Sequence, residues 1–325
     1  MPQRRGALPV SDAEVLGSSA TYARGVPFDR LERLRSKTPV VWLDGRLDGG
    51  AGAWAVLRYA DVRRALSHPE LFVSEPDGVF HGPLTPAGHF PGSDDERASA
   101  ERPDGGDRGD RGEDGDAADG GDGDDGDMAL LDMDPPARAM LDRVPRDATV
   151  DFVTEVTAEL PETVRNTLAG GLYALLRHPA QHERLLAAPG DDRLLDSAVE
   201  EMLRWWTPVT QVARTVRRST VMGGVPLRAG ERVALWLASA NHDGEAFPDP
   251  DSFQAGRFLT SARPHLGFGF GTRACVGARL ARVHLRALLV AILERPGRPR
   301  LTGEPVMLRS SARRGFERLP VRWTG

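Results

Sequence analysis

Apolar residues recur at intervals of three and four along much of the chain, which predicts amphipathic helices. The clearest case is 162–177, which Pro179 follows as a stop signal. Its apolar face consists of Val164, Leu168, Leu172, Leu175 and Leu176. The segment 191–208 has the same spacing, with two Asp residues at its start that suit a helix dipole. Shorter helices are predicted within 27–39, 59–69 and 178–190, and a further helix from Val276 to the stop at Pro296.

Other segments have the alternation and turn residues of strands. Residues 39–45 and 53–59 read as two strands of a hairpin with a Gly-rich turn between them. Strands and turns are also predicted between Gln211 and Ala238. Near the end of the chain, 305–310 and 319–323 are expected to form a terminal strand pair. The predicted fold class is mainly α with small antiparallel β-sheets.

One segment has neither pattern. Residues 104–127 are almost entirely Asp and Gly, so they cannot bury apolar surface, and their like charges repel. Asp side chains also provide Ca²⁺ ligands, but the ordered spacing of a calcium-binding loop is missing. The expected division is therefore an N-terminal sheet and helix region (1–92), a disordered acidic insertion (93–127) and a helical core (128–325).

Composition limits the compartment and the partners. The chain has 325 residues, a formal net charge of -5 and one cysteine. The acidic balance gives no reason to expect nucleic-acid binding, and one cysteine cannot form an internal disulfide. No signal peptide and no apolar run of about 20 residues are found. We expect a cytoplasmic protein without membrane or nucleic-acid partners.

That cysteine lies in the stretch "HLGFGFGTRACVGARLAR", residues 265–282. The start of the predicted helix and the nearby Arg273 both favour a negatively charged thiolate at Cys275. Glycines on both sides let the backbone turn sharply or approach a flat ligand. On the residues alone, four interpretations compete: an inert buried thiol, a nucleophile paired with His265 or His284, a zinc ligand, and an axial ligand of haem iron.

The same stretch resembles the haem-binding loop of the cytochrome P-450 family. The matching positions are Phe268, Gly271, Arg273, Cys275 and Gly277. The resemblance implies haem b (iron protoporphyrin IX) as cofactor, with Cys275 as the proximal ligand of its iron. It also implies that Arg273 and His265 contact the haem propionates. In the strand "VARTV", Arg214 falls at a further propionate-binding position of the family.

A second motif of the family is Glu-x-x-Arg, here Glu201 and Arg204. Residues three apart share a helix face, and alone such a pair is usually a solvated surface pair. In the family a later arginine joins it, and "FPDPDSFQAGRF" supplies Arg257. The resemblance therefore implies a buried ionic cluster of these three side chains that fixes the core.

The oxygen-activating half departs from the family pattern. Glu162 and Thr163 fall on its acid–alcohol pair and are the catalytic candidates, although they also suit the first turn of a helix. Pro161 precedes them, and proline suits a helix start rather than a helix middle, so we expect the helix to begin near Pro161. Only 28 positions separate Asp134 from Glu162, much shorter than the family's span. A truncated fold with little of the lid is therefore expected.

The segment that opens this span also differs. In "DPPARAMLDRV", Arg138 takes the position of a propionate-binding His, a tolerable exchange. Asp142 takes the position of an Arg, and its charge would repel a propionate.

The resemblance implies a haem-thiolate monooxygenase that hydroxylates a small organic molecule with O₂ and electrons from a ferredoxin-like donor. Three arginines of the last helix, Arg279, Arg282 and Arg286, are expected to form a solvated face rather than a docking site for that donor. The alternative function is a non-catalytic haem-binding or structural relative that assists a partner enzyme, which the missing lid favours. Retention of Cys275 favours haem binding in either case.

Overall fold

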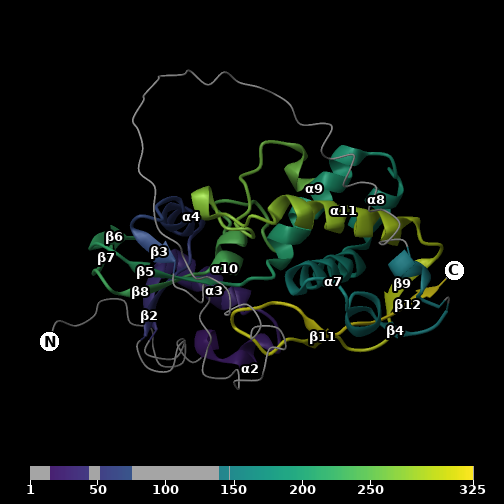
Figure 1. The fold of residues 1–325 in the computed structure, drawn as a ribbon, viewed down its shortest axis with the longest axis horizontal. Coiled ribbons are helices and arrows are strands. Elements are labelled where there is room, and N and C mark those ends of the chain that lie inside the picture. Colours follow the sequence, from purple (N-terminus) through teal and green to yellow (C-terminus); the bar gives the residue numbers. More distant parts are fainter. Residues whose placement is uncertain (1–14, 44–51, 75–138, 146, 325) are drawn as a thin grey trace, which may run out of the picture.

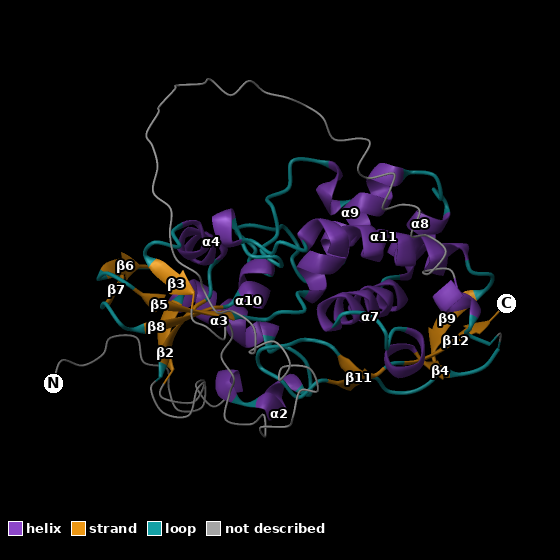
Figure 2. Ribbon diagram, viewed as in Figure 1, coloured by secondary structure: helices purple, strands orange, loops and turns teal. Residues whose placement is uncertain are grey.

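The structure is a computed structural model that describes residues 15–43, 52–74, 139–145 and 147–324. The predicted acidic insertion (93–127) and Arg138 lie outside the described residues. The three longest helices gather at one end of the molecule, and the largest sheet lies with shorter helices at the other (Figure 1). The predicted class, mainly α with small sheets, is confirmed (Figure 2).

The predicted helices are present with close to the expected bounds. The α-helices are α2 (Ser19–Tyr22), α3 (Phe28–Lys37), α4 (Tyr59–Ser67), α7 (Glu162–Arg177), α8 (Pro179–Leu186), α9 (Asp192–Trp206), α10 (Leu237–Asn241) and α11 (Ala278–Glu294). Helix α7 has Pro161 as its N-cap, so the predicted helix start is confirmed. Before it, Phe152–Val156 form a single π-helical turn. At the start of α9, the Asp191 carboxylate accepts a hydrogen bond from the backbone N–H of Leu194, as an N-cap does.

The largest sheet has the strand order β1-β2-β8-β5-β3. Its strands are β1 (Val40–Leu43), β2 (Ala53–Val56), β3 (Phe72–Ser74), β5 (Val212–Val216) and β8 (Arg232–Leu235). The predicted hairpin of β1 and β2 is confirmed, whereas β2 and β8 pair in parallel. Alternate residues of β1 and β2 pack into different apolar clusters, so the sheet is buried on both faces.

The predicted terminal strand pair is wrong. Strand β10 (Val306–Met307) pairs with β11 (Phe316–Arg318), while β12 (Pro320–Thr324) lies between β4 (Val150–Asp151) and β9 (Arg298–Leu301). The pattern of residues within a strand does not show which other strand it pairs with, because pairing depends on which segments the tertiary structure places next to each other. The remaining hairpin joins β6 (Thr220–Met222) to β7 (Val225–Leu227).

Helices α7, α9 and α11 enclose the main apolar core. Two glycines of α7 allow α9 to approach closely. A Cβ atom built on Gly170 would lie 2.0 Å from the Trp206 ring, and one on Gly171 would lie 2.5 Å from Met202 Sδ. This tight contact places the start of α7 and the end of α9 beside the loop that precedes α11.

Candidate functional site

A cavity of about 430 Å³ opens where α7, β5 and the loop before α11 meet. It brings together Thr163, Arg214, Phe268, Arg273, Cys275 and Gly277 from the predicted site. Most of the remaining wall is apolar and includes Leu66, Val164, Val209 and Leu237. Glu162 and His265 are not among its lining residues.

The loop that carries Cys275 folds back on itself. The Cys275 N–H donates to the carbonyl of Phe268 at 2.8 Å, and the Ala274 N–H donates to Gly271 at 3.1 Å. Gly269 and Gly271 have φ angles of 79° and 73°, left-handed values that favour glycine. Helix α11 begins directly after this turn, with Gly277 as its N-cap. The thiol of Cys275 is therefore exposed beside the N-terminus of a helix.

Two cations lie at this cavity without a carboxylate partner among the described residues. Arg214 is buried, and burial lowers its pKa, an effect that the nearby charge of Arg273 reinforces. One N–H of the Arg214 guanidinium donates to its neighbour Ala213, at 2.7 Å from the carbonyl oxygen. Two like charges that converge on one cavity repel each other, so an anionic group between them would stabilise the arrangement.

His265 is buried behind the loop and turns both ring nitrogens to the protein. Its Nδ1 accepts a hydrogen bond from the Gly267 N–H at 3.0 Å, which assigns the ring proton to Nε2. Nε2 lies 3.1 Å from Glu200 Oε2, and this contact is an ion pair when the imidazole carries both protons. On its other side, the Glu200 carboxylate binds Arg282 of α11 at 2.5 and 3.0 Å.

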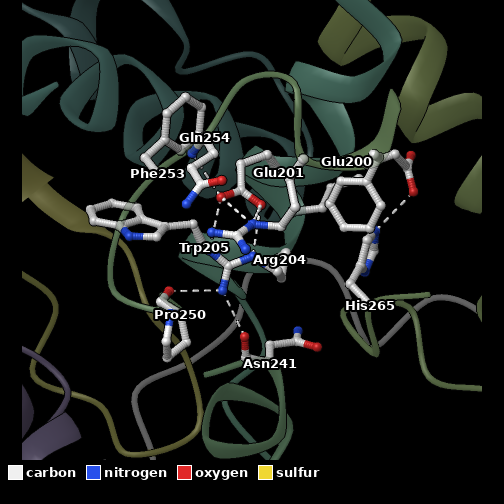
Figure 3. A network of polar contacts seen from close by, with 12 residues as sticks. Glu200, Glu201, Arg204, Trp205, Asn241, Pro250, Phe253, Gln254 and His265 are labelled. Atoms are coloured by element: carbon white, nitrogen blue, oxygen red, sulfur yellow. Dashed lines mark hydrogen bonds and ion pairs between the residues drawn. The ribbon is translucent and has the colours of Figure 1, made fainter. Parts of the chain in front are cut away.

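The predicted ionic cluster is present (Figure 3). Arg204 donates twice to the Glu201 carboxylate, at 2.7 and 2.8 Å, and both side chains are fully buried. Arg257 Nε lies 3.1 and 3.0 Å from the two oxygens of that carboxylate. Burial lowers the pKa of Arg257, while the Glu201 charge opposes that change. The remaining N–H groups donate to backbone carbonyls, including those of Asn241 and Pro250.

Comparison with known proteins decides the family, because residues 129–295, more than half of the chain, match the family described as cytochrome P-450. The chain belongs to the cytochrome P-450 family. A steroid C26-monooxygenase of Mycolicibacterium smegmatis is 45% identical over 165 residues, which cover 50% of this chain and 40% of that protein. A methyl-branched lipid omega-hydroxylase of Mycobacterium bovis is 38% identical over 164 residues, which cover 50% of this chain and 37% of that protein.

The chain therefore matches about two fifths of the length of these relatives. Among solved structures, cytochrome P-450-153 from Novosphingobium aromaticivorans is 27% identical, with a TM-score of 0.74 and coverage of 97% of this chain and 100% of that one. This likeness agrees with the P-450 fold expected from the sequence. Within the described residues, none of the helices has the length and apolar character to cross a membrane.

The P-450 family implies a haem cofactor, and the residues of this cavity fit one. The single thiol stands at the wall of an apolar cavity, as a ligand of haem iron requires. Arg214 and Arg273 supply the positive charge that carboxylate groups of the cofactor would bind. No group of three or more His, Cys, Asp or Glu side chains in the described parts of the chain could hold a metal ion. A zinc centre is therefore not built from those residues.

The two oxygen-activating candidates are the first two residues of α7, and their side chains point in different directions. Thr163 lines the cavity, whereas Glu162 does not, because successive side chains of a helix point about 100° apart. Asp142 lies elsewhere, in a second cavity with Glu294 and Arg295 at the end of α11. It therefore does not reach the cations of the first cavity.

Sequence reasoning missed two groups at this site. One is Glu200, for which the doubled Glu of "VEEMLRW" was the available signal. The other is the apolar wall from Leu66, Val209 and Leu237, which come from separate segments and carry no local motif. Arg282 and Arg286, expected on a solvated face, pair instead with α9 through Glu200, Asp192 and Asp196.

The Glu200 contacts predict a pH dependence of stability. Burial alone would raise the pKa of Glu200, but its contacts with His265 and Arg282 outweigh burial and lower that pKa to about 2, from 4.5. A carboxylate whose pKa is lowered by folding stabilises the folded protein at any pH above its pKa in the unfolded chain. This stabilisation is lost as the pH falls through its pKa in the folded protein. Glu200→Gln should therefore cost on the order of 3 kcal/mol at neutral pH, with the gap to the parent closing between about pH 4.5 and 2.

Urea unfolding of both proteins across this pH range measures the gap. Glu183→Gln is the matched control, because Glu183 forms an exposed pair with Arg298 at 3.3 Å. The control should lose little stability at any pH. A Glu200→Gln gap that stays constant with pH would contradict the prediction.

Proposed function

We propose that this protein is a haem-thiolate monooxygenase that hydroxylates a small, mainly apolar organic molecule. The observation that carries the proposal is the position of Cys275 at the wall of an apolar cavity that also contains Arg214 and Arg273. The relatives' names, a steroid C26-monooxygenase and a lipid omega-hydroxylase, support apolar substrates. The electron donor we propose is ferredoxin-like, and a reducing cytoplasm would keep the single cysteine as a free thiol.

The residues have distinct proposed roles. Cys275 Sγ would hold the iron of haem b, and Arg214 and Arg273 would bind its propionates. When bound, a thiolate-ligated haem supplies reductive activation of dioxygen. Phe268 and Gly277 shape the loop around the thiol, since an apolar ring and a missing side chain both let a flat ligand approach. The apolar wall, including Val209 and Leu237, would bind the organic substrate and exclude water.

A reduced sample treated with carbon monoxide tests the proposal. Purified protein supplied with haem should give a strongly red-shifted Soret band, the signature of a thiolate ligand. Turnover is then measured with a surrogate ferredoxin and its reductase, with a panel of sterols and branched fatty acids as substrates. Absence of haem uptake with Cys275 intact would overturn the proposal.

A specific observation favours the second function, a haem-binding relative without turnover. Helix α7 begins at Glu162, so no α-helical turn leads directly into the acid–alcohol pair. In the family this pair lies in the middle of a long helix, and the half that precedes it is replaced here by a π-helical turn and a bend. A red-shifted Soret band together with peroxide release and no product on every substrate would establish this second function.

Thr163 is the residue we propose for proton delivery, with Glu162 beside it in the chain. Thr163→Ala should lower product formed per electron consumed by roughly 10²-fold, because general acid–base groups contribute at least that much, and peroxide should rise in its place. Product and peroxide are measured together under the surrogate redox system. Thr302→Ala, at an exposed position after β9, is the control and should match the parent. Equal product from Thr163→Ala and the parent would remove Thr163 from the mechanism.

A further inference from the structure

Glu200 and Glu201 are consecutive residues of α9 with different surroundings. Glu201 points into the fully buried ionic cluster, whereas Glu200 points toward His265 and the loop before α11 (Figure 3). The Glu200 side chain is only 24% exposed and contacts two basic side chains, His265 and Arg282. A carboxylate that is mostly buried between two donors is held in one orientation.

His265 transmits this fixed position to the loop backbone. Its Nδ1 accepts from the Gly267 N–H, while its Nε2 faces Glu200. The preceding N–H, that of Leu266, donates to Asn241 Oδ1 at 2.7 Å. Two consecutive backbone N–H groups, those of Leu266 and Gly267, thus donate to buried side chains. Because Glu200 fixes the His265 ring, the ring restricts the loop more than a freely rotating acceptor would.

The same loop leads directly to the thiol. Gly267 precedes Phe268, whose carbonyl accepts the N–H of Cys275 at 2.8 Å. The Arg282 guanidinium lies over the Phe268 ring, 4.8 Å from its centroid, so Arg282 contacts the loop while it binds Glu200. A cation over an aromatic face is attracted to it. The loop is therefore held at Gly267 through His265 and at Phe268 through Arg282.

Helices α9 and α11 contain a second ion pair that lacks this connection. One turn before Glu200, Asp196 pairs with Arg286 at 3.0 Å, and Asp196 is 65% exposed. Glu200 and Arg282 lie four residues from these partners in opposite directions along their helices. The Asp196 pair joins the same two helices and, within the part of the chain that the structure describes, has no hydrogen bond or ion pair with the loop, which makes it a natural control.

We propose that Glu200, His265 and Arg282, the Glu200 triad, hold loop 267–275 in the conformation that presents Cys275 to the cavity. His265 then acts as a positioning residue, in place of the propionate contact expected from the sequence. Glu200 is a positioning residue that acts through His265 and Arg282. The haem-related part of this inference rests on the proposed function, whereas the loop conformation does not.

Amide hydrogen exchange in the haem-free protein tests the loop conformation directly. Gly267 N–H should exchange about tenfold faster in Glu200→Ala and in His265→Ala, the change that loss of one ordinary hydrogen bond produces. Because Glu200 acts on Gly267 through His265, the double variant should exchange no faster than His265→Ala alone. Asp196→Ala should leave Gly267 unchanged. Glu200→Gln, which keeps the volume, serves if Glu200→Ala does not fold.

The haem-loaded protein gives the second readout. With carbon monoxide, the share of protein with the red-shifted Soret band should decrease in Glu200→Ala and stay at the parent's value in Asp196→Ala. The proposal is overturned if the Gly267 N–H exchanges at the same rate in Glu200→Ala and in Asp196→Ala. It is also overturned if the effects of Glu200→Ala and His265→Ala on that exchange rate are additive in the double variant. Failure of the parent to bind haem would count against the proposed function alone, since the exchange result still decides the role of the triad.

Discussion

Replacing Cys275 with serine should abolish the red-shifted Soret band that we expect for the reduced, carbon monoxide-treated protein. The thiolate is the ligand that donates electron density to the iron, and a serine hydroxyl at neutral pH remains protonated and donates far less. The band should be lost completely rather than weakened, because Cys275 is the only cysteine in the chain. The comparison is made on samples with equal protein and haem content.

The fold should survive this change. Cys275 is exposed, and it forms backbone hydrogen bonds with Phe268 and Ala278 that serine keeps. We expect the free energy of unfolding of haem-free Cys275→Ser to lie within about 0.5 kcal/mol of the parent's. Val276→Ser is the matched control, because Val276 is the next residue and is 103% exposed. It should keep the red-shifted band. A Cys275→Ser protein with the parent's spectrum would show that another group holds the haem.

The largest loss of stability is expected for Glu201→Gln. Glu201 is the single carboxylate of a buried cluster with two guanidinium groups, those of Arg204 and Arg257. Without its charge, two buried cations remain side by side, and a broken buried ion pair of this kind costs about 3–5 kcal/mol. In a protein of 325 residues, that corresponds to a decrease in Tm of roughly 4–7 °C.

Urea unfolding and thermal unfolding followed by circular dichroism measure this loss. Glu159→Gln provides the control with the same chemical change, because Glu159 forms an exposed pair with Arg143 at 3.4 Å. Its effect should be small, since surface ion pairs contribute little. Equal losses from the two substitutions would contradict the structural role that we assign to the Glu201 cluster.

Local sequence patterns predicted most helices because their determinants are local. The apolar spacing of 162–177 and the prolines at positions 161 and 179 define α7 to the residue. The doubled Asp at the start of α9 likewise marks its N-terminus, and Asp191 caps it. Strand partners were less predictable. The segments 305–310 and 319–323 form strands, but each pairs with other parts of the chain. Strand pairing is a contact between segments that are distant in the sequence, and the strand propensity of one segment does not predict its partner.

The sequence by itself determined the chemistry available at this site: one thiol in a glycine-rich turn before a helix, arginines on both sides, and a Glu-x-x-Arg pair with a later arginine. These are properties of residue types and short spacings. Only the tertiary structure decided which of them meet. It placed Arg214 and Arg273 at one cavity with Cys275, separated Glu162 from Thr163, and turned His265 toward Glu200. The reason is physical: the direction of a side chain depends on the packing of helices α7, α9 and α11, which are separate segments of the chain and adjacent in space.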